Sequence, residues 1–218
     1  MKPITINAFE ITELSDKARE RAYHKWLDGY EYFCADDNRA SLLAFEKSFP
    51  VKIRDWSYGG RGEGVSWDFT KDDDIEELSG HRLATYLWNN FSDVLYQRKY
   101  KTSFKRKGKI NHRMITQKLC KDRTTGEEYY WTKVTSNIFV ETYNCPLTGY
   151  CIDNSLLDPM WKFMDKPDGR TFKELIDDCF EEWVKDCNTD YEYSSSEEFF
   201  IEECASQDWS FDEGGRIL

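Results

Sequence analysis

Apolar residues recur at helical spacing in five stretches of the chain. Ser15 is typical of a helix N-cap. It is followed by apolar residues at every fourth position, Ala18, Ala22, Trp26 and Tyr30. This spacing predicts an amphipathic helix of about 15–18 residues. The same criterion predicts further helices from residue 36 or 37 to Pro50, over 79–97, over 171–187, and from 194–196 onward.

Alternating and β-branched residues predict two groups of antiparallel strands. Stretches 51–58 and 65–69 flank a loop, residues 59–64, that contains four glycines. Because the loop lacks the Lys-Ser/Thr ending of a phosphate-binding loop, we interpret it as a hairpin bend. Residues 100–143 are rich in Thr, Tyr, Val and Ile and predict two or three more strands. The clearest hairpin joins 114–121 to 127–134, with 138–143 as a further strand candidate.

The C-terminal third contains shorter signals. Asp153 or Asn154 is expected to cap a short helix that runs through Leu157. Thr171 and Glu174 have the spacing of a capping box, which marks the start of the helix over 171–187. The tail, residues 209–217, has the glycine and aromatic pattern of a terminal hairpin.

Together these elements predict an α+β protein: one interleaved domain over residues 1–218, in which amphipathic helices pack on an antiparallel sheet. Three sub-regions are expected: helices and a hairpin over 1–97, basic antiparallel strands over 98–150, and an acidic helical region over 151–218. Aromatic residues make up 16% of the chain, which is enough to build a core despite 33% charged residues.

Charge is distributed unevenly around a net value of −11. Residues 1–70, 71–143 and 144–218 carry formal charges of −2, +4 and −13. Residues 98–123 hold eleven Lys or Arg and one Asp, interleaved with aromatic residues, a mixture that suits nucleic acid. The candidate basic binding residues are Arg98, Lys99, Lys101, Lys105, Arg106, Lys107, Lys109 and Arg113. The alternative interpretation is that these cations line the solvent face of a sheet and face the acidic C-terminal region, within one chain or across a dimer.

The acidic residues of the C-terminal helices form the second candidate surface. On the helix over 171–187 they lie opposite the apolar face. One helical turn rises 5.4 Å, a spacing of the same order as that of phosphates along DNA. The candidate acidic binding residues are Glu174, Asp177, Asp178, Glu181, Glu182, Asp186, Glu198 and Glu202. The alternative interpretation is a solvated helix face.

Other chemistry has little support. The three His residues accompany no nucleophile motif, so no catalytic residue is assigned and a non-enzymatic protein is expected. Seven Cys at wide spacing indicate thiols rather than a disulfide scaffold. Cys145 and Cys151 have five residues between them, an unusual spacing for zinc, and no metal or cofactor is assigned. The lack of a signal peptide or long apolar run predicts a cytoplasmic protein with no membrane partner.

Four stretches resemble a family of small phage and prophage proteins. They are residues 13–22, the aromatic and glycine-containing pair within 56–69, residues 147–151 and residues 209–215. Members of this family are mostly uncharacterised, and some are labelled automatically as antitoxins of toxin–antitoxin systems. The resemblance implies a phage origin and carries over no active-site residue.

Two functional hypotheses follow. In the first, the chain is a phage-derived, non-enzymatic inhibitor of anti-defence or anti-CRISPR type. Its acidic helices would bind a nucleic-acid-handling or defence protein of the host by imitating nucleic acid. In the alternative, it is an antitoxin or an RNA- or DNA-binding module that uses residues 98–123. Nucleic acid is a partner only in the second case, and the oligomeric state stays open.

Overall fold

The computed structural model describes residues 7–60, 62–70, 74–109, 115–141 and 145–218. The predicted α+β class is confirmed. The α-helices are α1 (Asp16–Leu27), α2 (Ala35–Ser48), α3 (Gly80–Leu95), α4 (Ile152–Asp165), α5 (Phe172–Ser194) and α6 (Glu197–Ser206). The strands are β1 (Val51–Ser57), β2 (Gly64–Phe69), β3 (Tyr96–Arg106), β4 (Ile115–Lys121) and β5 (Glu128–Glu141), and short 3-10 helices cover Ile11–Glu13 and Ile75–Glu77.

Helix α5 is the centre of the largest core. The predicted capping box is present: the Thr171 side chain accepts from the Glu174 amide, and the Glu174 carboxylate accepts from the Thr171 amide. The buried face of α5 includes the fully enclosed Trp183 and packs against α2, α3, α4 and the β1–β2 hairpin. The helix is 23 residues long and extends past the predicted end at residue 187.

The glycine-rich loop forms the expected hairpin bend between β1 and β2. The two strands pair antiparallel, with a register shift between Ile53 and Asp55. Gly59 adopts a φ of 74° beside the Tyr191 ring, a conformation that favours glycine. Its amide donates to Asn188 of α5, and Asn188 in turn donates to Glu63 on the other side of the loop. These two bonds fix the hairpin against α5.

A second, smaller core joins the two ends of the chain. It consists of seven buried residues, Ile11, Leu14, Ala18, Ala22, Phe200, Cys204 and Phe211. Phe211 pairs with Phe9 and with Ile217 through isolated β-bridges, so the predicted terminal hairpin also takes in the N-terminal segment. The sequence also predicts an opening strand over residues 4–11. Residues 4–6 lie outside the described part of the chain, Phe9 forms an isolated β-bridge, and Ile11 begins a 3-10 helix.

Helix α4 is longer than predicted and begins differently. It spans 14 residues and continues through Pro159, because Leu157, Met160 and Phe163 are all fully buried and their packing outweighs the lost backbone bond. The predicted cap at Asp153 is wrong. Its buried carboxylate accepts from the amides of Leu147, Thr148 and Gly149 and so closes the preceding loop.

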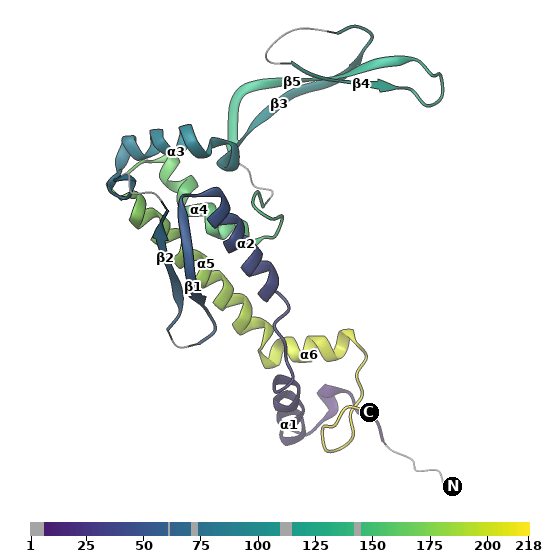
Figure 1. Cartoon of the computed structure of the whole chain (residues 1–218). Helices are drawn as coiled ribbons and strands as arrows, with labels where there is room; N and C mark the ends of the chain where they lie inside the picture. Colours follow the sequence, from purple (N-terminus) through teal and green to yellow (C-terminus); the bar gives the residue numbers. More distant parts are fainter. Residues whose placement is uncertain (1–6, 61, 71–73, 110–114, 142–144) are drawn as a thin grey trace.

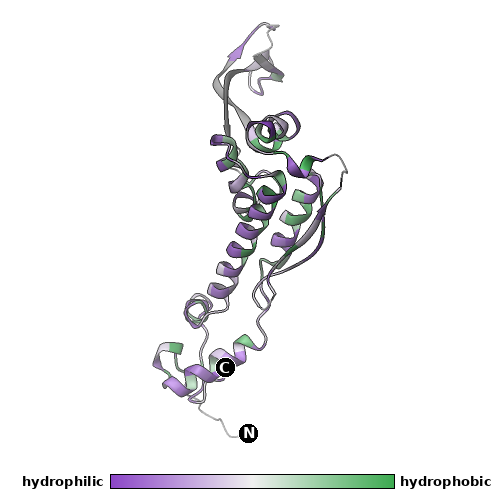
Figure 2. Cartoon of the chain, turned by 90° about the vertical axis from the view of Figure 1, so that its left-hand side faces the viewer, coloured by the Kyte–Doolittle hydropathy of each residue, from purple (hydrophilic) through white to green (hydrophobic). Residues whose placement is uncertain are grey.

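The remaining strands form a separate three-stranded antiparallel sheet in the order β3-β5-β4. We call residues 96–141 the arm. Its principal contact with the rest of the molecule is the junction between α3 and β3. Figures 1 and 2 show that it extends away from the helices at one end, while α1 and α6 lie at the other. The separate strands expected at 127–134 and 138–143 are one continuous strand, β5, as far as Glu141. The helices therefore pack on the β1–β2 sheet, and in the described part of the chain no helix covers the arm (Figure 1).

Candidate functional site

One face of the arm combines lysines with an exposed tryptophan. Trp131 of β5 is the register partner of both Lys105 on β3 and Lys118 on β4. Cross-strand partners project to the same face of a sheet, so the side chains of Lys105, Trp131 and Lys118 form a row on this face. Trp131 is 37% exposed. Lys133 and Tyr129, two residues away on the same strand, lie on this face as well, and the Lys105 ammonium is 4.7 Å from the centre of the Tyr129 ring.

The other predicted basic residues are spread over the arm. Arg106 is the partner of Tyr130 and therefore lies on the opposite face. Lys107 and Lys109 are exposed just after β3. Arg98, Lys99 and Lys101 lie along the backbone of β3, and Arg113 lies outside the described residues. Of the predicted set, Lys105 and Arg106 therefore lie on opposite faces of the sheet, and four members are exposed at the far half of the arm.

Several of the predicted acidic residues on α5 already have partners within the chain. Glu174 belongs to the capping box, whose hydrogen bonds from Thr171 lower the pKa of its carboxyl. Asp177 accepts from the Trp67 indole at 2.8 Å and from Lys173 at 3.0 Å. Asp178 pairs with Arg170 at 2.5 Å. These carboxylates stabilise the helix and its attachment to the hairpin.

The rest of the acidic set divides into partnered and open residues. Glu182 pairs with Lys185, Asp186 accepts from Ser155, and Glu202 accepts from Tyr193. In contrast, Glu181 and Glu198 are exposed and have no hydrogen-bond or ion-pair partner among the described residues. The open part of the acidic surface is thus smaller than the sequence pattern suggests.

The basic and acidic regions are spatially separate. The arm contains twelve Lys or Arg and four Asp or Glu, a formal charge of +8, whereas the rest of the chain has eighteen and 37, a formal charge of −19. Lys105 forms its ion pair with Asp122 of the arm itself, and the acidic helix residues pair with Arg170, Lys173 and Lys185. The interpretation in which the basic strands cover the acidic helices therefore does not fit this arrangement (Figure 1).

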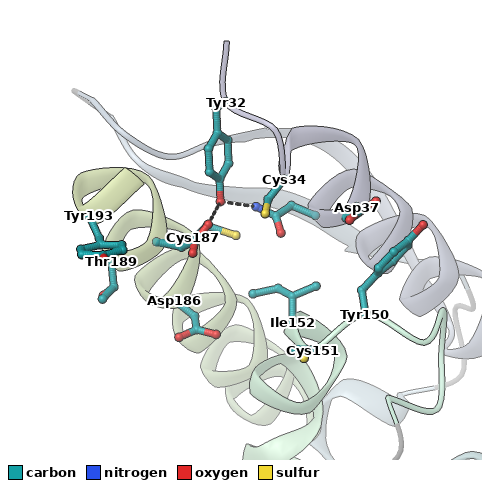
Figure 3. A pocket seen from close by; sticks show the side chains of 12 residues that line it. Tyr32, Cys34, Asp37, Tyr150, Cys151, Ile152, Asp186, Cys187, Thr189 and Tyr193 are labelled. Atoms are coloured by element: carbon teal, nitrogen blue, oxygen red, sulfur yellow. Dashed lines mark hydrogen bonds between the residues drawn. The ribbon is translucent and has the colours of Figure 1, made fainter. Parts of the chain in front are cut away.

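A hollow of about 540 Å³ lies where the start of α2, the loop before α4 and the C-terminal half of α5 meet (Figure 3). We call it the tyrosine pocket. Its lining residues are Tyr32, Cys34, Asp37, Asn38, Tyr150, Cys151, Ile152, Asp186, Cys187, Thr189, Asp190 and Tyr193.

The Tyr32 hydroxyl is the polar centre of this pocket. It donates to the Asp190 carboxylate at 2.5 Å and accepts from the Asn38 amide at 3.2 Å. Burial and the hydrogen bond to Asp190 raise the pKa of Tyr32, which keeps the phenol protonated. Burial and the Asp190 charge also raise the pKa of the Cys34 thiol. Neither group is thereby activated as a nucleophile.

The cysteines give no metal centre in the described part of the chain. Cys179, Cys187 and Cys204 are buried thiols, and burial raises the pKa of Cys204 to about 11. Burial, followed by the neighbouring Cys151, raises the pKa of Cys145. Among the described residues, no three His, Cys, Asp or Glu side chains are arranged to hold a metal ion.

Comparisons with known proteins supply no relative. No family model, curated protein or solved structure matches this chain. Within the described residues, every helix is too short or too polar to cross a membrane.

Sequence reasoning missed the two best-defined surfaces. The Trp131 face could have been anticipated in part, because Tyr129, Trp131 and Lys133 alternate with the period of a strand. Its lysine partners on β3 and β4 depend on the register, which the sequence alone does not specify. The tyrosine pocket is lined by three segments, residues 32–38, 150–152 and 186–193. Because the first is more than 100 residues from the other two, no local pattern indicates the pocket.

Proposed function

We propose that this chain is a binding protein that engages single-stranded nucleic acid through the face of the arm that carries Trp131. The observation that supports this most strongly is the row Lys105–Trp131–Lys118 across the three strands, with Lys133 beside it. An exposed indole offers a stacking surface to an unpaired base, and ammonium groups on both sides suit the flanking phosphates. This is the alternative hypothesis of the sequence analysis, and the geometry supports it better than it supports the first.

A net charge of −11 would repel nucleic acid if it were spread evenly over the molecule, but it is not. The negative charge belongs to the rest of the chain, and the arm extends away from it (Figure 1). Charges are screened over about 8–10 Å at physiological salt. A strand of nucleic acid at the Trp131 face therefore meets mainly the +8 of the arm.

The test is a fluorescence anisotropy titration with a labelled 20-nucleotide single strand. Charge reversal by Lys105→Glu with Lys118→Glu is expected to weaken binding more than tenfold and to reduce its salt dependence. Trp131→Ala is expected to weaken binding at least fivefold, since stacking contributes about 1–3 kcal/mol per base. The matched control is Lys25→Glu with Lys47→Glu, two exposed lysines outside the arm. Equal loss in the control, or no binding by the wild type at micromolar protein in low salt, contradicts the proposal.

The second candidate is inhibition of a host nucleic-acid-handling or defence protein by the acidic helices, as the phage-like stretches suggest. The specific observation in its favour is that Glu181 on α5 and Glu198 on α6 stay exposed and unpaired among the described residues. Glu181→Lys with Glu198→Lys removes this charge without breaking an internal hydrogen bond. Loss of a salt-sensitive partner in pull-downs by this variant, with retention by the Lys105/Lys118 variant, would favour this candidate.

A further inference from the structure

The tyrosine pocket is large, and the charged residues that line it are all anionic. Its volume of about 540 Å³ falls within the range of small-molecule sites, about 300–1,000 Å³. Three of its lining residues are aspartates, Asp37, Asp186 and Asp190, and none is Lys, Arg or His. No ion pair involves these aspartates among the described residues. The pocket thus carries a formal charge of −3 that the surrounding protein leaves unbalanced.

The donors that reach these carboxylates are neutral hydroxyls. Tyr32 donates to Asp190 and Ser155 donates to Asp186, while the nearby Asp37 carboxylate raises the pKa of the Tyr150 hydroxyl. A carboxylate offers about four acceptor sites, so each aspartate can accept further hydrogen bonds. The hydroxyls hold the carboxylates in place and leave their charge available to a ligand.

Aromatic rings form the walls between these carboxylates. Figure 3 shows Tyr32 projecting into the pocket, with Tyr193 on the α5 side and Tyr150 on the opposite side. Tyr150 and Tyr193 are 43% and 46% exposed, so their rings border the entrance. A cation near an aromatic ring is attracted to its face, and Ile152 adds an apolar side chain to the lining.

Helices α2 and α4 both begin at this pocket, since their N-cap residues, Cys34 and Cys151, line it. Each contributes about half a positive charge, which would favour an anion. Asp37 lies in the first turn of α2 and offsets its terminus. Three carboxylates exceed two half-charges, so the balance still favours a cation.

We infer that the tyrosine pocket binds an organic cation, an alkylammonium or guanidinium group on a short carbon chain. The carbon chain would lie against the tyrosine rings and Ile152. The cationic group would donate hydrogen bonds to the carboxylates of Asp186 and Asp190. A bare metal ion fits less well, because it needs several ligands within one small sphere and the described residues provide no such cluster. This site is independent of the arm.

The test is isothermal titration of the full chain with agmatine and with putrescine. Both are expected to bind, whereas 1,4-butanediol, the uncharged counterpart of putrescine, is not. Asp186→Asn keeps an acceptor for Ser155 and removes one charge, and it is expected to weaken binding about tenfold. Glu182→Gln, an equal change of charge on the same helix outside the pocket, is expected to leave affinity unchanged.

A second pair of variants separates binding from folding. Tyr193→Phe retains the ring and is expected to bind as the wild type does, whereas Tyr193→Leu is expected to lose about tenfold, with circular dichroism unchanged in both. Blocked arginine, N-acetyl-arginine methylamide, tests the source of the cation: tighter binding than agmatine indicates a side chain of a partner, and weaker binding indicates a free cation. Absence of binding, or equal weakening by Glu182→Gln and Asp186→Asn, overturns the inference.

Discussion

The arm and the helical part of the molecule differ in how far their large side chains are buried and in the sign of their charge. Around α5, fully buried side chains such as Leu87, Phe45 and Trp183 form one continuous core. In the arm, two of the large apolar side chains, Leu119 and Trp131, are 51% and 37% exposed. The arm also carries a formal charge of +8, against −19 for the rest of the chain.

This difference indicates which region is maintained for its surface. A three-stranded sheet normally needs a buried apolar face for independent stability. In the part of the arm whose side chains are described, the backbone ladder and cross-strand pairs such as Lys105 with Trp131 hold the strands together. Exposed aromatic and basic side chains do little for folding, so we interpret the arm as the binding region and the helices as its support.

The largest expected effect contrasts one leucine from each region. Leu87→Ala removes a fully buried side chain of α3 and is expected to lower the free energy of unfolding by about 2–5 kcal/mol. Leu119→Ala removes a half-exposed side chain of β4 and is expected to change the free energy of unfolding by less than about 0.5 kcal/mol. Urea unfolding followed by circular dichroism measures both. Similar losses would mean that the arm shares the core of the helices.

The next effect concerns two glycines with positive φ. At Gly215, φ is 83° and a Cβ would lie 2.2 Å from the Ala18 carbonyl oxygen. Gly215→Ala is therefore expected to cost about 3 kcal/mol in the unfolding experiment, through backbone strain and forced separation from α1. At Gly126, φ is 72° and a Cβ would meet only Lys121 at 4.0 Å. Gly126→Ala is expected to cost about 1 kcal/mol, and this loss should affect the stability of the arm alone. A larger cost at Gly126 would contradict the comparison.

Local sequence patterns predicted most of the secondary structure. The helix over 171–187 and its capping box were recognisable because apolar spacing and cap chemistry agree at one place. Helix α4 continues past the predicted end at Leu157, because the burial of Met160 and Phe163 is a tertiary effect that outweighs the local cost of Pro159. Local signals were sufficient where tertiary contacts agreed with them.

The candidate sites were predictable only as charge, and not as geometry. The clusters of basic and acidic residues are evident in the sequence, but their partners are not. Asp178 with Arg170 and Asp177 with Trp67 show that an acidic residue on a helix can be structural. The placement of Trp131 between Lys105 and Lys118 requires a strand register that depends on distant pairing.

Removing the arm is expected to have a small effect on the stability of the rest. Arg98 and Phe139 are register partners, so residues 99–138 can be replaced by a two-residue Asn-Gly turn. The shortened chain should unfold within about 1 kcal/mol of the full chain at 0.5 M salt, because no side chain described within the replaced segment belongs to the helical core. It would have a formal charge of −19, so its stability should rise more steeply with salt. Loss of helical circular dichroism in this variant would contradict the separation of the two regions.

The smallest expected effect compares two aspartates that close turns, one in each region. Hydrogen bonds from the amides of Arg216 and Gly214 hold the pKa of Asp212 below its usual range. Those from Thr124 and Thr125 do the same for Asp122 in the arm. A lowered pKa in the folded state means that ionisation stabilises the fold above about pH 4, the unfolded value. This stability is lost as the pH falls through the folded pKa.

Asp212→Asn and Asp122→Asn keep an acceptor oxygen and remove the charge. Asp212 closes the turn that carries Phe211 into the terminal core, so Asp212→Asn should lower the stability at pH 7 and match the wild type at pH 2. Asp122→Asn should leave global unfolding unchanged at both pH values and should speed amide exchange only in β4 and β5, because the arm opens locally. The matched control is Asp208→Asn, since the Asp208 carboxylate has no hydrogen-bond partner among the described residues. A pH-dependent loss of global stability in Asp122→Asn equal to that in Asp212→Asn would show that the arm and the helices unfold as one unit.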